Sequence, residues 1–250
     1  PAGSALLALG PALAGCGMEG SGVFETRSFE LPPFDAVEIG YGADLEVKTG
    51  SVASTLITLD DNLFDALQVE VEDRVLRIGF DSGRSYTNYR LVAVVETPAL
   101  RGVELSGGST GWAQLDDASR LHLELSGASL LMIEAGEVDH VSMSLSGGSR
   151  VEMDRGVASR LTLEGSGGSS VQALEATLQN AEVDLSGGSE AELVVEQRDR
   201  LPLGRLSARP ARAARFGARR PLGRLDGRDG ARPLRLHLKE GAHPFDAPAD

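Results

Sequence analysis

Hydrophobic and polar residues alternate along much of the middle of the chain. Runs such as Leu121–Leu125 and Leu161–Glu164 place an apolar residue at every second position. This two-residue period is typical of a β-strand with one buried face, because successive side chains point to opposite sides of a strand. A helix cannot gather the leucines of a Leu-x-Leu-x-Leu run on one stripe. The pattern therefore predicts an all-β protein.

A short turn sequence, Ser-Gly-Gly-Ser with one Ser-Gly-Ala-Ser variant, separates these runs and returns at a constant interval. Its first serines are Ser106, Ser126, Ser146, Ser166 and Ser186. Glycine suits a tight corner because it adopts positive φ without a steric penalty. A period without slippage over successive copies predicts a repeat architecture.

Stacking such units predicts a β-solenoid. We expect a parallel β-helix-like fold with two strands per 20-residue coil, Ser-Gly-Gly-Ser corners, and coils roughly 4.8 Å apart. Apolar positions would then align into columns that form the core, for example Val103, Leu123, Met143, Leu163 and Val183.

The corners, together with Phe34–Ile39, Asp60–Leu63 and Val75–Ile78, carry a resemblance to a known family. Over roughly residues 23–195 the chain resembles the head GIN domain family of putative autotransporter adhesins. The resemblance implies a two-sheeted β-helix related in shape to pectin lyases, with Gly-Ser-Gly turns between the sheets. It also implies an adhesin role without a catalytic residue set.

The N-terminal residues differ in character from the repeats. Residues 1–16 contain a short apolar run that ends in Leu13-Ala-Gly-Cys16, which matches a bacterial lipobox. We therefore expect an incomplete signal peptide, acylation of Cys16 and attachment to a membrane through that lipid. Gly17 after the cysteine favours sorting to the outer membrane of a Gram-negative cell envelope. Cys16 is the only cysteine, so no intramolecular disulfide can form.

Composition and spacing predict how residues 17–197 are organised. Residues 17–23 are rich in glycine and predict a flexible tether. Residues 24–98 predict irregular N-terminal coils, and residues 99–197 the regular 20-residue repeats.

Residues 198–250 break the pattern of the repeats and are rich in arginine. Arginine, alanine, proline and glycine are what a GC-rich gene yields out of frame, so we expect a frameshifted or disordered tail. The alternative is a genuine basic tail that binds the acidic body of the chain, lipopolysaccharide or nucleic acid.

Charge and motifs limit the possible chemistry. The formal net charge of −13 argues against nucleic acid as a partner of the chain as a whole. The 4 histidines show no metal-ligand spacing, and Gly165–Ser169 lacks the strand-to-helix context of a nucleophile elbow. We therefore expect no catalytic residues, no cofactor and no dedicated metal site.

Two surface features are candidate binding sites. One is an acidic row, interrupted by Ser144, at Glu104, Glu124, Glu164 and Asp184. It could bind Ca²⁺ or another cation, supply an acid and a base for glycan cleavage, or simply form a solvated face. The other is Trp112, expected to face outward beside Met132 and to contact a glycan or protein, unless N-terminal loops cover it.

These observations predict a non-catalytic cell-surface or envelope lipoprotein, an adhesin that binds glycan or protein through a β-solenoid. One alternative is a polysaccharide lyase or hydrolase on a β-helix scaffold. Another is a periplasmic structural or envelope-stress lipoprotein. Accessibility to external protease separates the surface role from the periplasmic one.

Overall fold

The structure is a computed structural model that describes residues 17–197, 214–219 and 232–240. The all-β prediction is confirmed. Within the described residues 17 strands form one mixed sheet, β1 and β8 pair separately, and the only helix is the 3-10 segment η1 (Asp61–Ala66). That helix is too short to cross a membrane.

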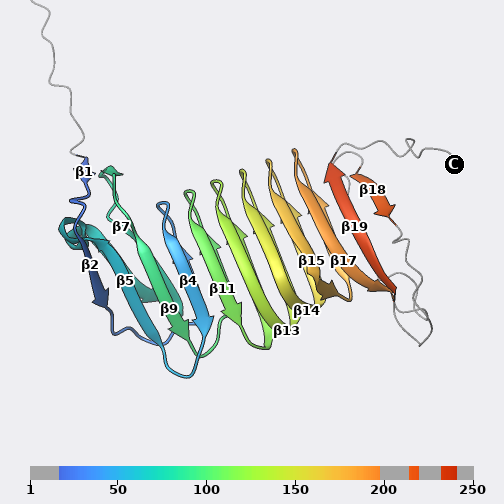
Figure 1. The fold of residues 1–250 in the computed structure, drawn as a ribbon, viewed down its shortest axis with the longest axis horizontal. Coiled ribbons are helices and arrows are strands. Elements are labelled where there is room, and N and C mark those ends of the chain that lie inside the picture. Colours follow the sequence, from blue (N-terminus) through green and yellow to red (C-terminus); the bar gives the residue numbers. More distant parts are fainter. Residues whose placement is uncertain (1–16, 198–213, 220–231, 241–250) are drawn as a thin grey trace, which may run out of the picture.

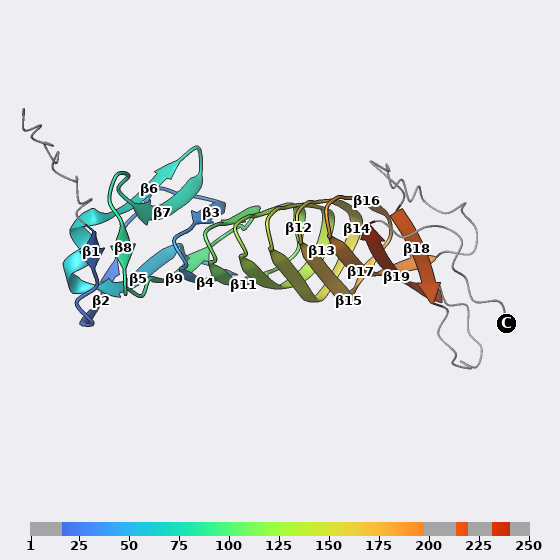
Figure 2. The same cartoon turned by 90° about the horizontal axis from the view of Figure 1, so that it is seen from above.

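The strands lie side by side along an elongated, curled sheet (Figures 1 and 2). Their bounds are β1 Met18–Glu19, β2 Phe24–Ser28, β3 Ala36–Ile39, β4 Asp44–Thr49, β5 Ser54–Asp60, β6 Leu67–Glu72, β7 Val75–Phe80, β8 Tyr86–Thr87, β9 Val92–Thr97, β10 Gly102–Leu105, β11 Thr110–Leu115, β12 Ala118–Leu125, β13 Leu130–Leu145, β14 Arg150–Gly165, β15 Ser170–Leu178, β16 Ala181–Leu185, β17 Glu190–Gln197, β18 Ala214–Arg219 and β19 Arg232–Glu240.

In the repeat region each strand pairs in parallel with the equivalent strand of the next repeat. Val103 lies opposite Leu123, and Leu123 lies opposite Met143. The same column continues through Leu163 and Val183, and all its side chains are at most 4% exposed. The predicted apolar column is therefore the core of this region, because the register repeats the same inward position in every layer.

The Ser-Gly corners have the backbone that glycine favours. The first glycine of each corner has φ between 63° and 73°, in the left-handed region, at Gly107, Gly127, Gly147, Gly167 and Gly187. The corners also pack tightly on one another, since a Cβ on Gly167 would lie 2.5 Å from the carbonyl oxygen of Gly147.

The second serine of each corner is buried and closes the turn. The Ser109 Oγ donates a 2.7 Å hydrogen bond to the carbonyl oxygen of Ser106, and Ser149 bonds Ser146 in the same way at 2.7 Å. The buried hydroxyl of the repeated serine therefore has a partner, the carbonyl at the start of its own corner.

The opposite corner differs from the prediction of two separate strands per coil. β13 and β14 each run for 16 residues through this corner, with register shifts between Ile133, Glu134 and Glu137. No Ser-Gly-Gly-Ser turn stands here. A bulge instead bends the strand while most of its backbone stays in the ladder.

The strands from residues 24–98 stack out of chain order. β3 and β4 pair in parallel with β10 and β11 on one side, where Val37 lies opposite Val103. On the other side they pair in parallel with β7 and β9. The layer formed by β3 and β4 therefore lies between layers that come later in the sequence, and the antiparallel strands β2, β5 and β6 complete that end.

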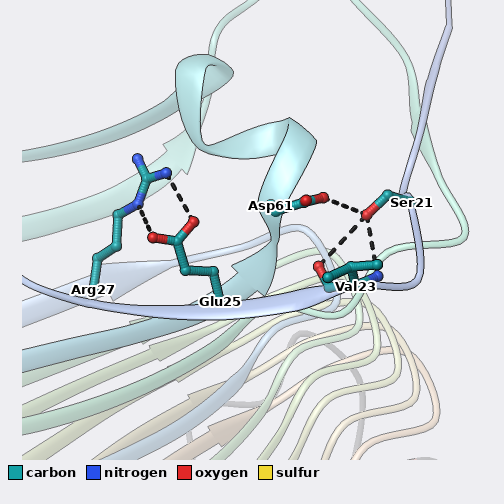
Figure 3. A network of polar contacts seen from close by, with 5 residues as sticks. All are labelled: Ser21, Val23, Glu25, Arg27 and Asp61. Atoms are coloured by element: carbon teal, nitrogen blue, oxygen red, sulfur yellow. Dashed lines mark hydrogen bonds and ion pairs between the residues drawn. The ribbon is translucent and has the colours of Figure 1, made fainter.

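The segment 17–23, expected to be a flexible tether, is hydrogen-bonded to the domain. β1 pairs with β8, and the Met18 amide donates a 2.7 Å bond to the Ser85 carbonyl. Figure 3 shows how the chain then turns: the Ser21 hydroxyl contacts Asp61 at the start of η1 and accepts a 3.1 Å bond from the Val23 amide. In β2, Arg27 pairs with Glu25 at 3.0 Å. Cys16 and the rest of residues 1–16 lie outside the described residues.

Two described strands lie within residues 198–250. β19 pairs antiparallel with β17, and β18 pairs antiparallel with β19. The other residues of this segment, and all its side chains, lie outside the description, so the frameshift hypothesis stays a prediction.

We predict that Gly167→Ala destabilises the fold by about 2 kcal/mol or more, because its Cβ meets the backbone of Gly147 and its φ of 73° disfavours alanine. Urea unfolding followed by circular dichroism measures the change. Gly168→Ala is the matched control, since its Cβ comes no closer than 3.9 Å to Gly147. Equal losses for the two variants would contradict this view of the corner.

Candidate binding surfaces

The acidic row lies on one outer face of the sheet, which we call the glutamate face: the outward side of β3, β10, β12, β16 and the C-terminal halves of β13 and β14. The register places Glu104 beside Glu124, and Glu164 beside Asp184. Ser144 lies between these two pairs. The column begins one layer earlier than expected, at Glu38 beside Glu104. Sequence reasoning missed Glu38 because its offset from Glu104 is not a multiple of the repeat.

Glu104 lies between two other carboxylates of the column, those of Glu38 and Glu124. Partial burial, followed by the charges of Glu38 and Glu124, raises the pKa of Glu104 above its ordinary value of 4.5. Arg77 offsets part of this repulsion by binding Glu38 at 2.8 Å. Like charges on adjacent strands oppose folding unless a cation or proton comes between them.

The acidic column does not form a metal cluster. Within the part of the chain that the structure describes, no three or more His, Cys, Asp or Glu side chains are arranged to hold a metal ion. Three of the carboxylates, Glu124, Glu164 and Asp184, instead line an open groove of about 540 Å³, which is also lined by Ser144, Ser146, Ser166 and Ser186. Hydroxyl and carboxylate oxygens along a groove can hydrogen-bond the hydroxyls of an extended ligand.

His122 has polar partners on the same face. Its Nδ1 lies 2.8 Å from the Ser142 Oγ, and its Nε2 lies 3.8 Å from Glu124. The two residues are one full repeat apart, so the parallel register places them side by side. The side chains of His122 and Glu124 are 57% and 54% exposed, so water screens them and no preorganised, water-excluded site surrounds the serine.

Trp112 lies on a second outer face, which we call the tryptophan face: the outward side of β4, β5, β9, β11 and the N-terminal half of β13. Met132 is beside it in the next layer, as expected, and Glu46 is beside it on β4. The same row continues through Val94 to Leu56, which is 42% exposed. Trp112 itself is half-buried. The N-terminal strands thus continue the row beside Trp112 rather than enclosing it, with Glu46 between Trp112 and the apolar Val94 and Leu56.

Tyr41 is a further exposed aromatic residue that sequence reasoning missed. It occupies the corner position held by Gly107 in the next layer, with φ of 66°, and is 47% exposed. Phe80 packs edge-on against its ring at 5.5 Å, and the Tyr89 hydroxyl donates a 2.6 Å bond to its carbonyl. The available sequence signal was Gly40-Tyr-Gly42, which replaces Ser-Gly-Gly at this corner. It places a tyrosine where the other corners have a left-handed glycine.

A family model described as "Putative auto-transporter adhesin, head GIN domain" matches residues 33–199. The chain belongs to this family. The match covers the layers from β3 to β17 and ends where the arginine-rich segment begins.

Solved structures similar to this head GIN domain protein come from species of Bacteroides and Parabacteroides, among others. A putative adhesin from Bacteroides fragilis has a TM-score of 0.60 at 18% identity, covering 69% of this chain and 81% of its own. A putative lipid binding protein from Parabacteroides distasonis has a TM-score of 0.56 at 20% identity, covering 69% and 82%. A putative adhesin from the same species has a TM-score of 0.58 at 16% identity, covering 68% and 82%. At these identities the likeness shows a shared fold. No curated protein matched the chain.

We predict that Glu104→Gln stabilises the fold at pH 7 by some tenths of a kcal/mol, a small effect because solvent screens the column. The folded protein holds the Glu104 proton more tightly than the unfolded chain, so ionised Glu104 destabilises the fold above its raised pKa. Below its ordinary value of 4.5 the carboxyl is protonated in both states, and the advantage of the variant disappears.

Urea unfolding of the wild type and the variant at pH 7 and pH 4 measures this difference. Glu46→Gln is the control, since Glu46 lies between Val94 and Trp112 instead of between carboxylates. If Glu104→Gln and Glu46→Gln behave alike at both pH values, repulsion within the column has no role in stability.

Proposed function

We propose that this protein is a lipid-anchored adhesin of the bacterial cell surface. It binds a glycan or a surface protein along the sides of a β-solenoid and catalyses no reaction. The observation that carries the proposal is the constant register from one repeat to the next, which presents equivalent outward positions in layer after layer. Membership of an adhesin family supports the same function.

Repetition of this kind suits an extended ligand. Along the glutamate face, hydroxyls and carboxylates recur beside one open groove, and along the tryptophan face Leu56 and Val94 lie in one row with Trp112 and Met132, on either side of Glu46. A polymer or a flat protein surface can contact several equivalent positions at once, so individually weak contacts add. An aromatic ring in such a row contributes a large contact area at small entropic cost.

We favour binding over a polysaccharide lyase or hydrolase because of the shape of these faces. Glycoside hydrolysis needs two carboxyl groups on opposite sides of a bond held in a cleft. The carboxylates described here stand side by side in a column on an open face. The adhesin proposal therefore uses them as hydrogen-bond acceptors.

The anchor is proposed at Cys16. Only Gly17 separates Cys16 from the hydrogen-bonded Met18, so an acyl chain on Cys16 would hold the β1 end of the domain close to the membrane. The repeat layers would then extend away from that end (Figure 2). Such an orientation would present the outer faces to a partner.

Protease treatment of intact cells tests this location. We expect external protease to remove the wild-type protein from intact bacteria, and Cys16→Ser to abolish its membrane fractionation. Protection in intact cells, with digestion only after the outer membrane is opened, would contradict surface display and favour a periplasmic structural or envelope-stress role.

Adherence of the same cells to panels of immobilised glycans and proteins tests binding and assigns the face. We expect either Ser144→Arg, which fills the groove of the glutamate face, or Trp112→Ala to lower adherence about tenfold. Gln114→Ala is the control, an exposed neighbour of Trp112 on β11. A wild type that adheres no better than cells without the protein would overturn the proposal.

A further inference from the structure

Basic side chains gather at the bend opposite the Ser-Gly corners. The register places Arg120 beside His140, and His140 beside Arg160. These residues line an open groove of about 660 Å³, together with Arg101 and Asn180. Sequence reasoning missed the cluster because it considered charge only as a net sum and not by position.

The arginines of this groove lack the partners that other cations have. Within residues 17–197, every lysine and arginine side chain that does not line this groove forms an ion pair with a carboxylate, with the exception of Arg90. Arg101 has only a long contact of 3.8 Å to Asp35. Arg120 and Arg160 are exposed and have no ion pair or hydrogen bond within the described residues. An acidic surface that leaves two neighbouring arginines unpaired has free capacity for an external anion.

The spacing of the arginines indicates the kind of anion. Adjacent parallel strands lie roughly 4.8 Å apart, so Arg120 and Arg160, separated by the layer of His140, are about 10 Å apart along the sheet. This matches the advance of an extended disaccharide. A guanidinium binds a carboxylate with two parallel hydrogen bonds, which favours arginine over a point charge for this task.

The rest of the groove is suited to a sugar. Ser119, Ser159 and Asn180 offer neutral hydrogen-bonding groups beside the arginines. The Asn180 amide already donates a 3.1 Å bond to the Ser159 carbonyl, which holds it over the adjacent layer. Asp139 is the acidic residue of the groove and lies next to His140. It repels an anion from its own column, so the ligand's acid groups must lie on the arginine column.

We propose that this groove binds an acidic glycan that carries one uronate per disaccharide, with successive carboxylates on Arg120 and Arg160. This proposal rests on the adhesin function proposed above and specifies its ligand class, with the arginine groove as a contact region in addition to the two faces named there. A nucleic acid fits less well, because its charge density is higher and the surrounding acidic surface repels the charges beyond the groove.

Binding of hyaluronan octasaccharide to the full 250-residue chain, measured by calorimetry at physiological ionic strength, tests the proposal. We expect Arg120→Ala and Arg160→Ala each to weaken the affinity about fivefold, and the double variant about twentyfold. Arg90→Ala is the matched control, an exposed arginine without an ion pair at the other end of the domain, and should change the affinity less than twofold. All variants keep residues 198–250, so that segment contributes equally to each.

Attraction by net charge, a ligand site elsewhere and a general anion site would each give a different result. An equal loss in Arg90→Ala would show attraction by net charge alone, and no loss in the double variant would place the ligand elsewhere. Competition by single-stranded DNA or inorganic phosphate as strong as by the octasaccharide would make the groove a general anion site. Each of these results overturns the proposal. If cells with the double variant still adhere as the wild type does, the groove proposal fails and the adhesin function stands; if wild-type cells do not adhere at all, the adhesin function itself fails.

Discussion

The stacking of one backbone layer on the next at a constant offset constrains the rest of this structure. Each strand of the repeats uses its backbone amides and carbonyls in a parallel ladder with the equivalent strand of the neighbouring repeat. Because that ladder admits no shift without exposing the apolar column, every corner must take the same path. The Ser-Gly corners meet this requirement through left-handed glycines and a buried serine hydroxyl that satisfies a corner carbonyl.

The same offset that builds the core also determines the surface. An outward residue repeated at the period becomes a column of like side chains, whatever its chemistry. On the glutamate face this produces adjacent carboxylates and a raised pKa at Glu104. At the opposite bend it produces the column of Arg120, His140 and Arg160. The carboxylates beside Glu104 cost electrostatic energy in the free protein, which a ligand of complementary charge would offset.

The two ends of the domain are built differently. At the N-terminal end, β2 and β6 pair antiparallel with their neighbours and an aromatic group surrounds Phe80, with Tyr86 stacked on its ring at 4.3 Å. At the other end β19 pairs antiparallel with β17. Antiparallel strands at the ends of a parallel stack change the pairing pattern and the shape of the edge, which limits addition of further parallel layers.

Much of the fold could be predicted from local pattern alone. The alternation of apolar residues and the fixed spacing of Ser-Gly turns determined the strands, the register between repeats and the buried column, because these depend on short-range geometry repeated many times. The outward position of Trp112 beside Met132 follows from the same arithmetic.

What the tertiary structure decided involves contacts at other offsets: the place of β3 and β4 between later layers, Glu38 beside Glu104, and β1 held against β8. No periodicity encodes these pairings, since long insertions intervene and the partners are chosen by packing of the whole domain. The unpaired state of Arg120 and Arg160 likewise became visible only in three dimensions, because it depends on which carboxylates the fold brings within reach.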